Sequence, residues 1–161
     1  MIRKQRRSNA LLYLTGDLLA TVAAFFFTWF LRFQLEVPPL TKGVPDFSLY
    51  LRLLPIVLIL WPVVFYFHGL YQSRRDRSRV DDALTLLLAI LVATFVLSAL
   101  QAWYRPTLPG SDRLFTYSRA FIAIFAVSDF AFVLSARVSV RWWLQRRRLA
   151  GHNLQRILIV G

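Results

Sequence analysis

Four long apolar stretches, separated by short polar and proline-containing connections, dominate the pattern along the chain. Each approaches the roughly 20 residues that a helix needs to cross a bilayer. The pattern therefore predicts an all-α membrane protein with four transmembrane helices. We expect these helices at about 10–33, 49–68, 82–103 and 114–140.

Two of these helices are expected to depart from a simple straight span. The second stretch contains Pro55 and Pro62. Because each proline removes a backbone donor, a bent helix is predicted there. The fourth helical pattern continues through RVSVRWWLQRRRLA to Gly151, a residue type that commonly ends helices. We expect this last helix to extend to about residue 150.

Composition agrees with the membrane prediction. The 161 residues are 57% hydrophobic, whereas soluble domains have about 45–50% apolar residues. The chain has no cysteine, which excludes a disulfide framework or a thiolate metal site within it.

The net charge of +12 would suggest a nucleic-acid partner in a soluble protein. Here most of the lysines and arginines lie near helix ends on one side: in the leader, in the loop 74–79 and after residue 136. Cytoplasmic loops of membrane proteins carry such an excess. We therefore expect both termini to be cytoplasmic, with the lipid bilayer and not nucleic acid as the partner.

The loop after the second helix carries a dense basic cluster, SRRDRSR. Two interpretations stay open. The cluster can anchor the loop at an anionic lipid surface, or it can hold the phosphate of a lipid carrier or a nucleotide by charge-assisted hydrogen bonds. The candidate contacts are Arg74, Arg75, Arg77 and Arg79.

Asp17 and Asp129 are acids inside predicted membrane helices, where ionisable residues are costly and often functional. At about 1.5 Å per residue, each lies about 12 Å from the cytoplasmic end of its helix. The carboxylates either face each other with one protonated, or each binds a donor elsewhere in the bundle. Two roles are possible for them: they line a polar cavity open to the cytoplasm, or they make interhelical hydrogen bonds that fix how the helices pack. We favour the second role.

No catalytic, metal-binding or cofactor-binding constellation is evident within the chain. No general acid and base pair, nucleophile elbow or phosphate loop surrounds its hydroxyl residues. We therefore assign no catalytic or metal-binding residue to it.

The ending, RILIVG, has a different pattern from the rest. The apolar run 157–160 is typical of a strand buried on both faces, as in parallel sheets. Gly161 would then open a nucleotide-binding GxGxxG loop. We predict two parts: a four-helix transmembrane domain at 1–150, and at 151–161 the first strand of a cytoplasmic Rossmann-like domain that otherwise lies beyond this chain.

Three segments carry a family resemblance: the first helix with Asp17 and the exit LRF at 31–33, the loop GLYQSRRDRSRVDDAL at 69–84, and GHNLQRILIVG at 151–161. Together they resemble the N-terminal membrane region of bacterial polyprenyl-phosphate sugar-1-phosphate transferases, truncated at the first strand of the following Rossmann-like domain. The resemblance covers essentially the whole chain.

The resemblance implies a parent enzyme of the bacterial inner membrane that initiates exopolysaccharide, capsule or O-antigen synthesis. It would move hexose-1-phosphate from a UDP-sugar to undecaprenyl phosphate, with magnesium and an acidic dyad in a later catalytic domain. No catalytic residue of that family maps onto this chain. The chain would anchor the enzyme, form homo-oligomers or organise the polyprenyl phosphate.

Two alternatives remain. Membrane-bound nucleotide-sugar 4,6-dehydratases share the plan of four helices before a nucleotide-binding domain. In them GLY tends to lead into a segment with tryptophan, whereas here it leads into arginines. A non-catalytic membrane scaffold is the third hypothesis. The apolar strand argues against a free-standing scaffold, because an unpaired apolar edge promotes aggregation.

Overall fold

The computed structural model describes residues 2–39, 44–72, 78–103 and 115–149. These residues form helices and no strand. The elements are α1 (Ile2–Trp29), the π-helical turn η1 (Phe30–Gln34), α2 (Phe47–Leu51), α3 (Leu54–Phe67), α4 (Arg79–Trp103) and α5 (Arg119–Leu149).

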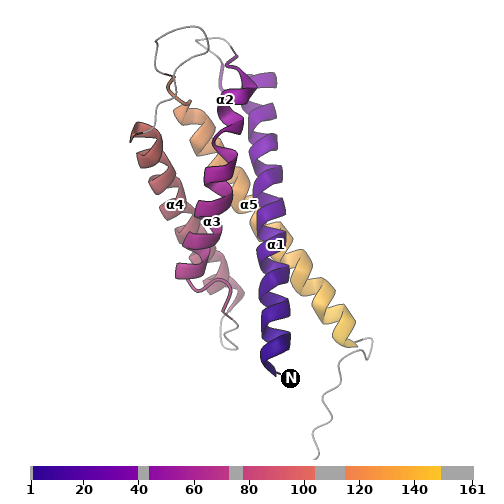
Figure 1. Ribbon diagram of the computed structural model, residues 1–161. Coiled ribbons are helices and arrows are strands. Elements are labelled where there is room, and N and C mark those ends of the chain that lie inside the picture. The colour runs from indigo at the N-terminus through magenta and orange to yellow at the C-terminus, as the bar shows by residue number, and fades with distance from the viewer. Residues whose placement is uncertain (1, 40–43, 73–77, 104–114, 150–161) are drawn as a thin grey trace, which may run out of the picture.

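The helices form an elongated bundle (Figure 1). The most extensive packing joins α1 to α5, and α4 packs on both α3 and α5. Because α1 and α5 run in opposite directions, the start of α1 and the end of α5 lie at the same end of the bundle (Figure 1). We call this the N-terminal end.

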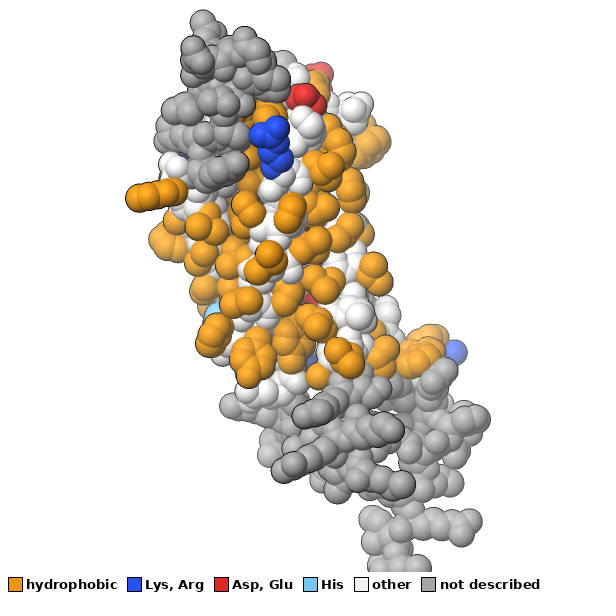
Figure 2. Space-filling view, viewed as in Figure 1, with side chains coloured by type: hydrophobic (Ala, Val, Ile, Leu, Met, Phe, Trp, Pro, Cys, Tyr) orange, Lys and Arg blue, Asp and Glu red, His pale blue; other side chains and the backbone are white. Residues whose placement is uncertain are grey.

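Four helical segments are long and apolar enough to cross a membrane: Ala10–Gln34, Phe47–Phe67, Val80–Trp103 and Arg119–Trp143. Their outer faces expose large apolar side chains, among them Phe67 at 80%, Phe95 at 77% and Leu19 at 72%. Figure 2 shows hydrophobic side chains covering the middle of one face, with charged ones mainly near its ends. Soluble monomers rarely expose so much contiguous apolar surface, so these features support a multi-pass membrane protein.

The first helix is longer than its predicted span. It begins at Ile2, because the leader RKQRR consists of good helix formers that continue the helix out of the apolar segment. At its other end the helix widens into η1, where the Leu35 amide donates to the Phe30 carbonyl at 3.1 Å. The apolar span itself, Ala10–Gln34, agrees with the prediction.

The predicted second helix, 49–68, is two helices. It breaks between α2 and α3, immediately before Pro55, which cannot donate a hydrogen bond to the preceding turn. Arg52 and Leu53 keep right-handed helical angles across the break. Pro62, by contrast, lies inside the continuous helix α3. The two prolines therefore have different effects on the backbone.

The fourth span begins later than the predicted residue 114. Residues 115–118 are not helical, and α5 starts at Arg119. Ser118 directly precedes α5. Its hydroxyl accepts a hydrogen bond from the Phe121 amide at 3.3 Å, and its own amide donates to the Tyr50 hydroxyl at 2.9 Å. A cap anchored to α2 therefore sets the start of α5, whereas its end at Leu149 agrees with the expected extension.

Aromatic rings fill the interface between α1 and α5. Phe25 is fully buried, and it meets Phe121 and Phe125 edge-on at ring-centroid distances of 5.4 and 5.8 Å. Such edge-to-face pairs add about 0.5–1.5 kcal/mol beyond area burial. The predicted strand at 157–160 and the rest of segment 151–161 lie outside the described residues.

Candidate functional site

A buried ion pair joins the first and last helices near the N-terminal end. The Arg137 guanidinium on α5 donates to both carboxylate oxygens of Asp17 on α1, from Nε at 3.0 Å and from Nη2 at 2.6 Å. Both side chains are less than a tenth exposed. A two-bond arginine–carboxylate pair fixes orientation as well as contributing energy. It therefore fixes how α1 and α5 pack.

Three aromatic rings surround the Arg137 guanidinium. Its carbon lies 5.6 Å from the ring centroid of Phe65 and 5.9 Å from those of Tyr13 and Tyr71. These rings come from α1, from α3 and from the turn after α3. Cation–π attraction therefore also holds α3 and that turn against the ion pair. Burial raises the pKa of Tyr71, and the Asp17 charge raises it further, so its hydroxyl stays neutral.

The second intramembrane acid has its own partner. Asp129 is fully buried, and the Trp61 indole Nε1 on α3 donates to its Oδ2 at 2.6 Å. The Thr21 side chain on α1 is also a neighbour of this carboxylate. The structure thus gives Asp17 and Asp129 separate donors on different helices.

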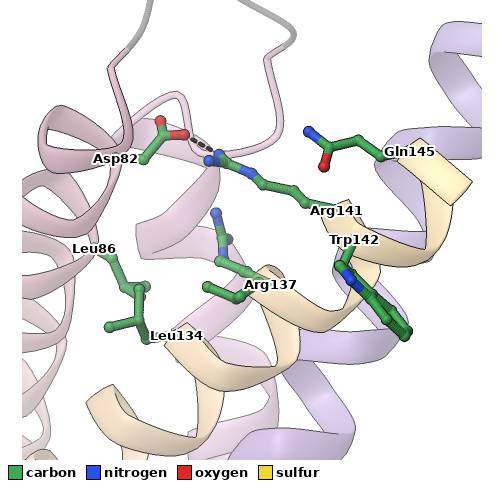
Figure 3. A pocket seen from close by; sticks show the side chains of 8 residues that line it. Asp82, Leu86, Leu134, Arg137, Arg141, Trp142 and Gln145 are labelled. Atoms are coloured by element: carbon green, nitrogen blue, oxygen red, sulfur yellow. Dashed lines mark hydrogen bonds and ion pairs between the residues drawn. The ribbon is translucent and has the colours of Figure 1, made fainter.

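A cavity of about 170 Å³ lies between α4 and α5, next to the buried pair. Its polar wall consists of Asp82 on α4 and of Arg137, Arg141 and Gln145 on α5. Arg141 makes an ion pair with Asp82 across the cavity, and Arg137 points toward the same space (Figure 3). Two arginines therefore line one small space between two helices.

The loop arginines lie largely outside what the structure describes. Arg74, Arg75 and Arg77 fall in the segment 73–77, and Arg79 begins α4 with its side chain undescribed. Gly161, expected to open a nucleotide-binding loop, also falls outside. Neither interpretation of SRRDRSR is tested by the described residues.

Sequence reasoning assigned Arg137 to the basic cytoplasmic cluster and missed its pairing. The signal was present: Arg137 and Asp17 are opposite charges at similar depth in the first and last helices. Trp61 carried no comparable signal, because an indole in an apolar helix is usually read as a packing residue. Only the contact of α3 with α1 and α5 shows what its N–H binds.

The architecture is that of a multi-pass membrane protein. Four apolar helices have membrane-spanning length, and a buried ion pair joins the first and the last of them. A family model described as a CoA-binding domain matches residues 66–161, which is more than half of the chain. The chain therefore belongs to the CoA-binding domain family, a domain found in sugar transferases. No curated protein and no solved structure matches the chain.

The described residues do not fit coenzyme A itself. The cavity of about 170 Å³ is smaller than the roughly 300–1,000 Å³ of small-molecule pockets. The described part of the chain also holds no cluster of three acidic, histidine or cysteine residues for a metal such as magnesium.

Proposed function

We propose that this chain is the membrane-anchoring domain of a polyprenyl-phosphate sugar-1-phosphate transferase of the bacterial inner membrane. The enzyme would move hexose-1-phosphate from a UDP-sugar to undecaprenyl phosphate and so initiate the synthesis of a surface polysaccharide. The observation that carries the proposal is the family match, which spans residues 66–161, from the end of α3 through α4 and α5.

The fold supports an anchoring role. Helix α5 continues from the end of its apolar span at Trp143 to Leu149, roughly 9 Å further at 1.5 Å per residue. It thereby leads out of the apolar zone toward whatever follows. The pair Arg137–Asp17 ties this helix to α1, so the exit of the chain is held by the bundle. Magnesium and the acidic dyad belong to the proposed catalytic domain and not to this chain.

The proposed orientation is testable with reporter fusions. We expect a reporter fused before residue 1 and one fused after residue 149 both to report the cytoplasm, since lysines and arginines concentrate at that side. Joint replacement of Arg74, Arg75, Arg77 and Arg79 by glutamine is expected to weaken or invert insertion of α3 and α4. Periplasmic signals from both fusions would contradict the topology. Unchanged insertion of the glutamine variant would remove the loop as the orientation signal.

The proposed activity is testable on the natural gene product that contains this chain. Membranes holding it are incubated with a labelled UDP-hexose, undecaprenyl phosphate and magnesium. We expect label in a lipid-linked sugar, with most of the product lost when residues 1–149 are deleted. Arg119→Gln, an exposed position at the far end of α5, is the control that should keep activity. A soluble 4-keto-6-deoxy nucleotide sugar would indicate a dehydratase instead, and neither product would favour a scaffold.

A further inference from the structure

The cavity between α4 and α5 lies at the boundary of the apolar spans. Asp82 is near the start of the span Val80–Trp103, and Arg141 is near the end of the span Arg119–Trp143. Arg137 lies six residues inside that end, roughly 9 Å deeper along the helix axis. If these spans cross a bilayer, the cavity lies where lipid headgroups meet the hydrocarbon.

The lining of the cavity has a polar part and an apolar part, like the headgroup and the chain of a lipid. The polar lining consists of Asp82, Arg137, Arg141 and Gln145, and the side chains of Asp82 and the two arginines point toward the same space (Figure 3). The remaining lining is apolar and comes from both helices: Leu86, Leu134, Val138 and Trp142. Val138 and Trp142 are also 59% and 53% exposed on the outer surface of α5. A bound molecule can therefore contact cations and continue along an apolar surface.

The volume of the cavity indicates which part of a lipid it can hold. The cavity has a volume of about 170 Å³ and is partly open to the surface. This space accommodates a phosphate group with the first atoms of its chain.

The two arginines retain donors for such a group. Arg137 uses Nε and Nη2 on Asp17, and its Nη1 makes no hydrogen bond among the described residues. Arg141 binds Asp82 through Nη2 alone, and its side chain is 39% exposed. The Asp82 side chain is 21% exposed, so the pair is partly buried. A phosphate can exchange with this single carboxylate on Arg141. Guanidinium groups match phosphate geometry by paired N–H donors.

We infer that this cavity binds the phosphate group of a membrane lipid, with Arg141 as the exchangeable ligand and Arg137 as the fixed one. Asp82 acts as a competing anion that holds Arg141 in place when no lipid is bound. Basic pockets between membrane helices bind lipid headgroups in this manner. The inference rests on the proposed membrane location of the chain, and a prenyl phosphate acceptor is one lipid of the required chemistry.

The test measures lipid binding by the protein in neutral detergent micelles, with complexes counted by native mass spectrometry. The probes are undecaprenyl phosphate, phosphatidylglycerol and undecaprenol, which lacks the phosphate. We expect both phosphate lipids to bind and undecaprenol not to bind. Arg141→Gln should weaken binding about tenfold, the loss of one charge-assisted contact. Arg119→Gln, on the same helix at the far end, should leave binding unchanged.

Asp82→Asn separates ligand binding from a purely structural role. Removal of the competing carboxylate should tighten phosphate binding, whereas a structural ion pair would only lose stability. Equal binding of undecaprenol and undecaprenyl phosphate would overturn the inference, as would wild-type binding by Arg141→Gln. Tighter binding of undecaprenyl phosphate than of phosphatidylglycerol would identify a carrier site, and equal binding a general anionic-lipid site; both support a lipid phosphate. Displacement of the lipid by equimolar inorganic phosphate would overturn the lipid assignment.

A flotation experiment keeps the two proposals apart. The same variants are reconstituted into phosphatidylcholine vesicles and floated on a density gradient, with alkaline extraction to remove peripheral protein. Protein that floats but binds no phosphate lipid overturns this inference alone. Protein that fails to float overturns the proposed membrane function.

Discussion

Arg137→Leu is expected to destabilise the bundle by about 3–5 kcal/mol, because it leaves the Asp17 carboxylate buried without a counter-charge. The substitution also removes the cation from the ring set of Tyr13, Phe65 and Tyr71. The free energy of unfolding can be measured by reversible unfolding in mixed neutral and anionic detergent micelles. This change is expected to be among the two most damaging side-chain substitutions in the described helices.

The double variant Asp17→Leu with Arg137→Leu tests the cause. Because it removes both charges and keeps apolar volume, it is expected to recover most of the lost stability. Arg119→Leu, at an exposed position of the same helix, serves as the control and should change stability by no more than about 0.5 kcal/mol. Equal stability of Arg137→Leu and wild type would show that the pair contributes nothing to packing.

Trp61→Ala is expected to cost about 3–5 kcal/mol for the deleted ring, in addition to the loss of the donor to Asp129. The indole is 1% exposed, and it packs against the Phe125 ring at 5.3 Å. Its Nε1 donates to the Asp129 carboxylate at 2.6 Å. The same detergent unfolding experiment measures the loss.

Two further variants separate packing from hydrogen bonding. Trp61→Phe keeps an aromatic ring and removes the donor, so it should cost about 1–3 kcal/mol. Adding Asp129→Leu to Trp61→Phe should restore much of that loss, because both partners are then apolar. Trp103→Ala is the matched control: its side chain is 92% exposed, and the expected change is within about 0.5 kcal/mol. A similar loss for Trp61→Ala and Trp103→Ala would refute the proposed role of the buried indole.

Helix breaks and starts show where local sequence was sufficient and where it was not. Pro55 marks the break before α3 in the sequence, because a missing amide acts locally. Pro62 carries the same local signal, yet it lies within an unbroken helix. At the start of α5, the Ser118 hydroxyl is a local capping signal, whereas the bond of its amide to the Tyr50 hydroxyl comes from α2 and cannot be seen in residues 114–119.

The candidate site also has some features that the sequence predicts and others that only the structure shows. The depth of Asp17 and Asp129 within apolar helices follows from counting residues, since helix rise is fixed at about 1.5 Å per residue. Their partners depend on which helices touch and on how each is rotated about its axis. A charge at the correct depth on α5 therefore had several possible roles until α1 and α5 were placed against each other.

The sequence by itself determined the class of this protein: four helices long and apolar enough to cross a membrane, and a basic excess toward one end. Those properties depend on composition and on periodic backbone geometry, which are local. Only the tertiary structure decided that Arg137 pairs with Asp17, that the Trp61 indole donates a hydrogen bond to Asp129, and that a polar cavity lies between α4 and α5. These features need side chains from helices far apart in the chain, and their rotation is set by packing.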